Sequence, residues 1–336
     1  MTTTTTTRAA GRTAARFLKA LAATSGNPIG ASAFIDEKRW LDGPQIKAAV
    51  DMLTQGNTPS LQGSVGGDFM LAVRPATIIG RLPLLRRVPV NIRLVYQTDG
   101  VRAYWVPERR NKPMSAGRFT DAGSIAARKV IALTVITEEL ARAGNGDDLI
   151  TRDLQAAAVE RLDSSFIDQA NAGVVDEEPA SITYGATAIP GTTDPAVDIR
   201  AALAAFNGRL ESAAWIMHPT VAASLNLRGG AFETVNALGG TLVGIPVVTS
   251  SAVPLDSNGS SITLLDQDSI EYAGLDGAQL RVSTEAAIEM ESDPTTGAST
   301  LVSLYQTNSV GLIAEMYANW RARPGAVVVI QGASYG

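Results

Sequence analysis

The sequence contains few residues that could carry catalytic chemistry. It has no cysteine and one histidine, His218, which excludes thiolate nucleophiles, disulfide bridges and most histidine-based mechanisms. A general base needs a nucleophile and an orienting group nearby, and neither is visible around His218. The histidine follows an apolar stretch and precedes Pro219, so helix capping is the favoured interpretation.

Glycine and carboxylate patterns give no stronger indication of an enzyme. No Gly-x-Ser-x-Gly elbow occurs, and the glycines of residues 239–244 lack the spacing of a dinucleotide-binding or phosphate-binding loop. Glu289, Glu291 and Asp293 alternate, so in a strand they would share one face that could hold a hard cation, although a solvated or subunit-contacting face is favoured. We therefore predict no enzyme, no metal and no cofactor, with a hydrolytic enzyme as a disfavoured alternative.

Positive charge is concentrated in one long polar hairpin, predicted over residues 96–120. A hairpin of this length and basicity cannot bury itself on its own domain, so we expect it to lie on another molecule. Its strands are expected at 91–97 and 102–106, joined by a turn at Thr98-Asp99-Gly100. The residues expected to contact that other molecule are Arg102, Glu108, Arg109, Arg110, Lys112 and Arg118.

The composition is that of a globular protein. The chain has 336 residues, of which 45% are hydrophobic and 18% charged, which suits one large domain or two intergrown domains. The net charge of −5 is too mild for nucleic-acid binding over the whole surface, although a local basic patch would still be compatible with it. No apolar run approaches the roughly 20 residues that cross a bilayer, so we expect a soluble cytoplasmic protein without a membrane partner.

The N-terminal part is predicted to be helical. Basic residues recur there at three-residue and four-residue spacing, which predicts a short amphipathic helix with one basic face. A solvated basic face is favoured over a contact with nucleic acid or a scaffold. A second helix is expected at about 36–53, with a break near Gly43-Pro44 as an alternative. The basic residues of the first helix are Arg8, Arg12, Arg16 and Lys19.

The middle of the chain changes from extended to helical patterns. Residues 56–67 resemble a linker, and the prolines of 71–90 predict an extended arm. After a β-rich segment at 129–140, an apolar stripe over 147–166 predicts a helix of roughly six turns. A further helix is expected to begin at Asp194-Pro195 and to end near residue 210.

The last third is predicted to be mostly strands, with one helix opened by His218-Pro219. The long strand at 300–320 is expected to return and pair with the segment at 129–140, which makes residues 174–278 an insertion. The predicted fold class is therefore α+β, with two intergrown domains. The other strands are expected at 213–217, 241–249, 262–265, 270–273, 278–290 and 326–330.

Several stretches occur in a characteristic order. They are Trp105-Val106-Pro107-Glu108, Lys112-Pro113, Ser115, Phe119, Lys129-Val130-Ile131-Ala132, Thr137-Glu138-Glu139-Leu140, Trp215-Ile216-Met217 before His218-Pro219, Gly244-Ile245-Pro246-Val247-Val248, Gln306-Thr307-Asn308 and Arg323-Pro324 with Ala326-Val327. From about residue 67 to residue 330, this order resembles the major capsid proteins of tailed bacteriophages, which have the Hong Kong 97-type fold.

The resemblance implies a division of the chain. It predicts an N-terminal helical segment (1–58), an N-arm (59–92), an extended loop (93–122), a peripheral domain with a long spine helix (123–173 and 279–322) and an inserted axial domain (174–278 and 323–336). Many members carry a long N-terminal scaffolding segment, whereas only a short one precedes the arm here. Scaffolding is therefore expected from a separate protein, or from this short segment, which would then persist in the mature shell.

The resemblance also implies a function. The subunits would assemble as pentamers and hexamers into an icosahedral head that encloses double-stranded DNA through non-specific contacts, with portal, scaffold or decoration proteins as further partners. The expected location is the virion, with assembly in the host cytoplasm. An encapsulin-like nanocompartment shell, which encloses a cargo enzyme, is the alternative.

Some members of that family join their subunits by isopeptide bonds. The corresponding residues here are Lys112 as the lysine, Asn308 as its partner and Glu315 as the assisting glutamate. An ordinary surface or salt-bridge role for Lys112 is favoured over this autocatalytic crosslinking. The basic face of Arg8, Arg12, Arg16 and Lys19 would touch the genome if it lies on the inner side of the shell.

Overall fold

Two β-sheets organise the computed structural model, which describes residues 11–55, 59–99, 104–105, 108, 118–142, 146–256, 259–285, 287–293 and 298–335. The first sheet has four strands in the order β1-β12-β15-β4, with β1 parallel to β12 and the other neighbours antiparallel. Its strands are β1 (Arg86–Arg87), β12 (Ile270–Ser283), β15 (Ser309–Ala322) and β4 (Arg128–Thr137).

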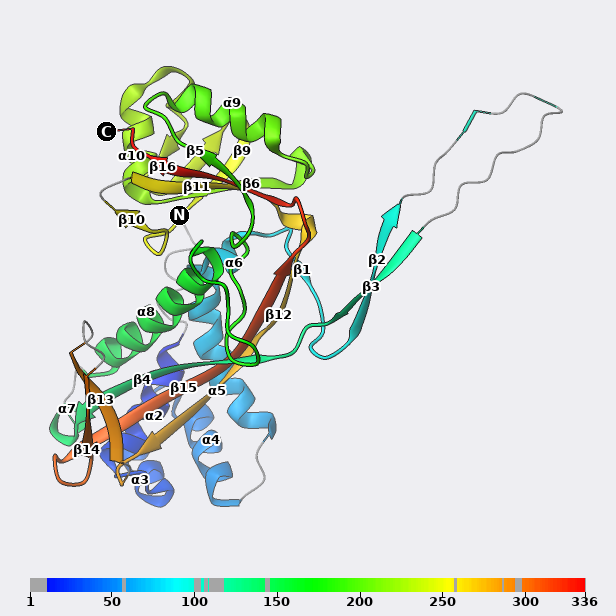
Figure 1. The fold of residues 1–336 in the computed structure, drawn as a ribbon. Helices are drawn as coiled ribbons and strands as arrows, with labels where there is room; N and C mark the ends of the chain where they lie inside the picture. Colours follow the sequence, from blue (N-terminus) through cyan, green and yellow to red (C-terminus); the bar gives the residue numbers. More distant parts are fainter. Residues whose placement is uncertain are drawn as a thin grey trace.

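The second sheet has eight strands and lies in a separate lobe (Figure 1). Its main path is β5-β16-β11-β6-β9-β8-β7, and β10 pairs with β11 beside that path. Helices α9 (Pro195–Ala205) and α10 (Pro219–Arg228) belong to this lobe. The strands are β5 (Thr187–Pro190), β6 (Ala213–Met217), β7 (Val235–Asn236), β8 (Gly239–Leu242), β9 (Ile245–Thr249), β10 (Leu255–Asp256), β11 (Gly259–Asp266) and β16 (Val327–Ala333).

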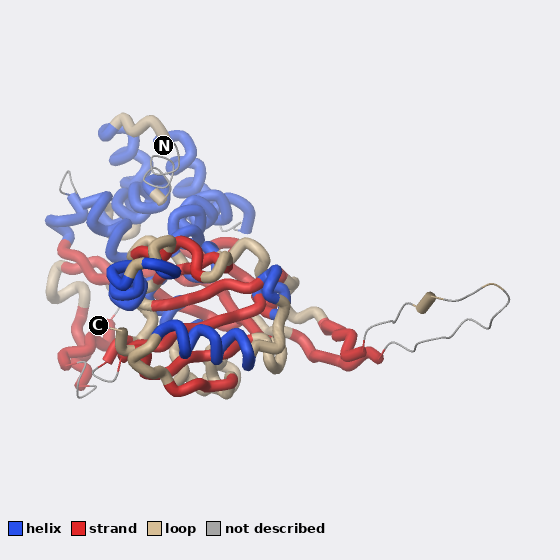
Figure 2. Tube along the Cα trace, turned by 90° about the horizontal axis from the view of Figure 1, so that it is seen from above, coloured by secondary structure: helices blue, strands red, loops and turns tan. Residues whose placement is uncertain are grey.

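A helical layer covers one face of the four-stranded sheet (Figure 2). It consists of α2 (Arg12–Ala23), α3 (Pro28–Lys38), α4 (Gly43–Gln55), α5 (Pro59–Val73) and α8 (Gly146–Ile167), with the short α7 (Glu138–Arg142) at its edge. Helix α2 contacts α5, α8 and the sheet, and most of its residues are buried in the core shared with β15. None of the described helices is long and apolar enough to cross a membrane.

Two hairpins extend from this body. Strands β2 (Arg93–Asp99) and β3 (Arg118–Ser124) form a separate two-stranded sheet that projects far from both lobes (Figure 1). Strands β13 (Ala287–Asp293) and β14 (Ala298–Ser303) form a second hairpin at the far end of the four-stranded sheet. The polar hairpin expected at 96–120 is therefore confirmed at its base, where Tyr96 pairs with Thr120.

Several expected elements are confirmed. The six-turn helix is α8, and the strand at 213–217 is β6. Asp194 caps α9 by accepting a hydrogen bond from the Ala196 backbone N–H at 2.9 Å. His218 caps α10, because its Nδ1 accepts from the Thr220 N–H at 3.2 Å. The expected return of the C-terminal strand is the antiparallel pairing of β15 with β4.

The expected linker and extended arm are wrong for residues 59–81, which are largely helical. Pro59 stands at the first position of α5, where a missing N–H removes no hydrogen bond. Gly66 lets α5 lie directly on β12, since an added Cβ would come within 1.7 Å of the Ala278 carbonyl oxygen. Further on, Pro83 separates the short helices η1 (Arg74–Ala76) and α6 (Ile78–Arg81) from β1.

Turn chemistry explains the other differences. The turn expected at 98–100 is wrong because Asp99 still pairs with Arg118, so β2 pairs with β3. Most of the strand expected at 102–106 lies outside the described residues. The single strand expected at 300–320 is β14 and β15, separated by a turn in which Asn308 has φ 51°. The strand expected at 278–290 is divided between β12 and β13. The boundary expected between 278 and 279 falls inside β12, which begins at Ile270.

Candidate intersubunit surfaces

The projecting hairpin has no core of its own. Arg93 and Val95 are exposed, and the described ion pair between the strands joins Arg93 Nε to Asp121 Oδ2 at 2.9 Å. Further along, Trp105 is fully exposed and Tyr104 about half exposed. An isolated two-stranded hairpin is marginally stable in water at best. The hairpin therefore has the character of a segment that is completed by another surface.

The root of the hairpin is fixed to the four-stranded sheet. Val88 and Ile125 pack on Ala273 of β12, and the Asn91 N–H donates to the Ile125 carbonyl oxygen at 2.8 Å. The Asn319 side chain of β15 also donates to the Ala126 carbonyl oxygen, at 2.5 Å. These contacts set the direction in which the hairpin leaves the body.

Residues expected to make contacts through the hairpin are only partly described. Glu108 is exposed, and Arg118 opens β3 opposite Asp99. Arg102, Arg109, Arg110 and Lys112 lie outside the described residues. Their role in contacts between subunits stays a prediction.

The second candidate surface is the outer face of β4. Within β4, residues 130–136 are apolar on both faces except for Thr134, which is typical of a strand that is covered on both sides. The inward side chains, including Ala132 and Ile136, pack under the helical layer. The outward side chains of Ile131 and Leu133 are 53% and 45% exposed. Because β4 is also the edge of its sheet, this surface has both apolar side chains and backbone groups to offer a partner.

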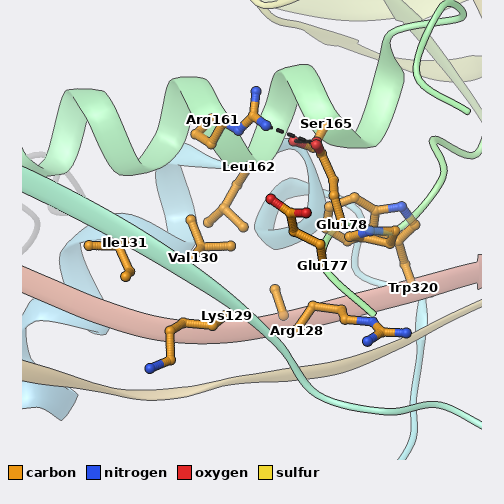
Figure 3. Close-up of a pocket in the computed structure, with 12 residues that line it drawn as sticks. Arg128, Lys129, Val130, Ile131, Arg161, Leu162, Ser165, Glu177, Glu178 and Trp320 are labelled. Atoms are coloured by element: carbon orange, nitrogen blue, oxygen red, sulfur yellow. Dashed lines mark hydrogen bonds and ion pairs between the residues drawn. The ribbon is translucent and has the colours of Figure 1, made fainter. Parts of the chain in front are cut away.

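Acidic residues lie near one end of β4. The turn that contains Asp176 and Glu177 lies beside the start of β4, where Arg128 Nη1 contacts Asp176 Oδ1 at 2.9 Å. Figure 3 shows Glu177 facing the pocket between β4 and α8, close to Val130. Both carboxylates are exposed, so they add negative charge beside the start of β4, on the side of the strand that faces α8.

The pocket itself has the features of a packed joint. Glu178 accepts from Ser165 Oγ at 2.6 Å and pairs with Arg161 Nη2 at 2.9 Å (Figure 3). Trp320 closes one end and donates from Nε1 to the Ala180 carbonyl oxygen at 2.9 Å. The polar groups are satisfied by one another, and the described residues contain no cluster of three histidine or acidic side chains that could hold a metal. We therefore find no feature of a ligand site here.

Glu315 and Asn308 occupy different environments. Glu315, on β15, is almost buried and accepts from Lys129 Nζ at 2.7 Å and from the Tyr317 hydroxyl at 3.0 Å. The hydrogen bond from Lys129 holds the pKa of Glu315 below its usual range. A carboxylate with a lowered pKa is a weak proton acceptor, which weighs against the expected assisting role. Asn308 is exposed in the turn before β15, and Lys112 is outside the described residues.

The basic residues of α2 do not form one solvated face. Lys19 is only 2% exposed. Arg16 pairs with Asp42 and lies over the Trp40 ring, with 5.1 Å between Cζ and the ring centroid. Arg12 is exposed, and Arg8 lies outside the described residues. The solvated face is therefore wrong for Arg16 and Lys19, because α2 is packed among α3, α4, α5, α7 and α8.

The arrangement of a projecting hairpin and two intergrown sheets has known counterparts. The family model described as the phage capsid family matches residues 82–332. The chain belongs to the phage capsid family. A capsid polyprotein of Pseudomonas phage PAJU2 is 39% identical over 296 residues, which is 81% of this chain and 44% of that protein. This chain therefore spans less than half the length of that curated relative.

Solved structures share the fold. One from Gordonia phage Cozz has a TM-score of 0.51 at 19% identity and covers 74% of this chain and 84% of that chain. One from Mycobacterium phage Ogopogo has a TM-score of 0.51 at 16% identity and covers 76% of this chain and 91% of that chain. The predicted Hong Kong 97-type α+β fold is confirmed. The matched region begins at residue 82, so helices α2 to α6 precede the part that defines the phage capsid family.

Two features of the site were not found from the sequence. The outward face of β4 could have been found, because the stretch Val130 to Ile136 is apolar at nearly every position instead of alternating. The acidic turn at 176–177 could not, since it lies far from β4 in the sequence and meets it only through the fold.

Proposed function

We propose that this chain is a major capsid protein, whose subunits form pentamers and hexamers that close into the icosahedral head around double-stranded phage DNA. The observation that carries the proposal is the hairpin β2–β3, which projects from the body and has no core of its own. The family match supports the same function. The phage head is favoured over the encapsulin-like nanocompartment, since the matched family and the curated relative are both phage capsids.

The hairpin of one subunit covers the outer face of β4 in the next. The hairpin has an exposed tryptophan and, by sequence, a cluster of positive charge. The face of β4 has an apolar stripe, and Asp176 and Glu177 lie beside the start of the same strand. Apolar burial would supply affinity, and opposite charges would select register and orientation.

This contact joins two different surfaces, so it is heterologous and closes into rings when the rotation between subunits permits. Each contact alone can be weak, because a subunit in a closed shell is held by several contacts at once. The net charge of −5 would limit adhesion of packaged DNA to the inner wall. Location in the virion, assembly in the host cytoplasm, and portal, scaffold and decoration partners follow from the same proposal.

A charge-swap experiment tests the contact. Replacing Arg109, Arg110 and Lys112 with Glu should abolish shells and leave folded, soluble subunits, because like charges would then face Asp176 and Glu177. Adding Asp176→Lys and Glu177→Lys to that variant should restore shells. Electron microscopy counts the particles, and circular dichroism confirms folding. Normal shells from the first variant would overturn the assignment, and a failed restoration would show that these carboxylates are not the partners.

The shell is expected to form without isopeptide crosslinks. The lowered pKa of Glu315, which is caused by its hydrogen bond from Lys129, supports this expectation. Denaturing gels of purified shells should show one band at the subunit mass of 35.1 kDa. A ladder of higher bands that disappears in Lys112→Arg would establish crosslinking instead.

A further inference from the structure

A buried aspartate joins three segments that are distant in sequence. Asp163 lies on α8 and is 1% exposed. Its Oδ1 accepts from the Ile78 N–H, the first residue of α6, at 2.7 Å. Its Oδ2 accepts from Ser250 Oγ, just after β9, at 2.9 Å. Asp163 therefore links the helix of one lobe to the segment before β1 and to the sheet of the other lobe.

Arg81 completes this joint. Its Nη2 lies 3.9 Å from Asp163 Oδ2, and its Nη1 donates to the Thr249 carbonyl oxygen at the end of β9. Ser250 is held in turn, because its N–H donates to the Met217 carbonyl oxygen of β6 at 3.2 Å. Figure 1 shows α6 between α8 and the lobe of the eight-stranded sheet. The joint is thus a non-covalent connection between the two lobes.

The charged surroundings of Asp163 are simple in the described part of the chain. From α6 comes the guanidinium of Arg81. From β9 and the residue after it come only a carbonyl and a hydroxyl. On α8 itself, the positions one turn away are Val159, Phe166 and Ile167, which are apolar, and Glu160, whose side chain is exposed. Hence one proton on Asp163 decides whether Arg81 faces a carboxylate or a neutral acid.

We propose that Asp163 is a proton-sensitive latch between the two lobes, closed when its protonated carboxyl is hydrogen-bonded to α6 and to the residue after β9, and loosened when the buried carboxyl ionises. A protonated carboxyl keeps the Ile78 hydrogen bond on its carbonyl oxygen. Its O–H then donates to Ser250 Oγ, which turns from donor to acceptor. Ionisation instead leaves a desolvated charge in the joint, which the attraction of Arg81 at 3.9 Å offsets only in part, so the contacts of Asp163 with α6 and Ser250 loosen and admit water.

Burial moves the pKa of Asp163 into a pH range in which the folded subunit can be studied. Desolvation raises the pKa of Asp163 to about 6, although the hydrogen bonds from Ile78 and Ser250 and the charge of Arg81 act in the opposite direction. Because the folded pKa lies above the ordinary value of 3.8 for an aspartate, the neutral form is favoured in the folded state. Its stabilising contribution is complete below about pH 4 and is lost as the pH rises through about 6.

The absence of cysteine from the chain permits a direct test on the full-length subunit. Ala156→Cys on α8, an exposed position two turns from Asp163, and Leu238→Cys at the exposed turn before β8 place one dye on each lobe. Energy transfer is measured from pH 4.5 to 8 in dilute, unassembled subunits. We expect a transition centred near pH 6 in the wild-type background. It should be absent in Asp163→Asn, a near-isosteric variant that stays neutral at every pH.

Two more variants make the result specific. Ser250→Ala should move the transition to higher pH, because it removes a donor that favours the carboxylate. Asp198→Asn is the matched control: Asp198 is also buried, but its partners Thr192 and Tyr335 lie within one lobe, so the transition should stay. Transfer that is constant over this pH range, a transition that persists in Asp163→Asn, or no movement in Ser250→Ala would each overturn the latch. The test uses single subunits and is independent of shell assembly.

Discussion

Replacing Phe17 with alanine tests whether the N-terminal helix is a permanent part of the folded subunit. Phe17 is 1% exposed and lies in the same apolar cluster as Val65 of α5 and Leu312 of β15. Removing a buried phenylalanine side chain typically costs about 3–5 kcal/mol, from lost transfer free energy and from the cavity that remains. Since whole domains are stable by only about 5–15 kcal/mol, Phe17→Ala should remove a large fraction of the free energy of unfolding.

The measurement is urea unfolding of unassembled subunits, followed by circular dichroism. Arg12→Ala is the control in the same helix, because Arg12 is exposed and should change the free energy of unfolding by less than about 0.5 kcal/mol. If α2 were a detachable scaffold helix, both variants would change the free energy of unfolding by similarly small amounts. A free energy of unfolding for Phe17→Ala within about 1 kcal/mol of the wild-type value would show that α2 is not part of the stable fold. Wild-type stability of a fragment 26–336 would show the same.

Two further variants test the packing of α5 and the ion pair of β15. Gly66→Ala should destabilise the fold by at least about 1–3 kcal/mol in urea, because its Cβ would meet the Ala278 carbonyl oxygen and force α5 away from β12. Gly67→Ala, which has open space around it, should be neutral or stabilising by up to about 1 kcal/mol; equal effects would contradict this packing. Glu315→Gln should lower stability at neutral pH. The pKa of Glu315 is lowered by the hydrogen bond from Lys129, so the contribution of its carboxylate is present above the unfolded pKa of 4.5 and lost as the pH falls through the folded one. The difference in melting temperature between wild type and variant should therefore shrink in acid, and a difference that is independent of pH would argue against the pair.

Local chemistry explains which elements were predictable. Helix α8 has an apolar stripe, Asp194 and His218 each precede a proline at a helix start, and β6 is a short apolar run. Each signal lies within a few residues, so the sequence contains it whole. The projecting hairpin was also predictable, because a long basic polar stretch between apolar strands has no place in a core.

The features that were missed depend on contacts between distant segments. The glycines and prolines of α5 are typical of a linker, and only the approach of β12 explains why Gly66 belongs in a helix. The spacing of Lys19 in the sequence is that of a solvated basic face, and only the packing of α2 against its neighbouring helices shows that this side chain is buried. Asp163 stands among the polar residues of an amphipathic helix, and its partners Ile78 and Ser250 are 85 and 87 residues away.

Electron microscopy of the purified recombinant protein, together with light scattering, measures most directly whether this chain assembles into shells. The protein should form uniform closed particles, alone or with a scaffold encoded beside it, and the variant Arg109→Glu, Arg110→Glu, Lys112→Glu should not. Wild-type protein that stays monomeric even when its genomic neighbours are co-expressed would contradict a shell-forming function for this chain.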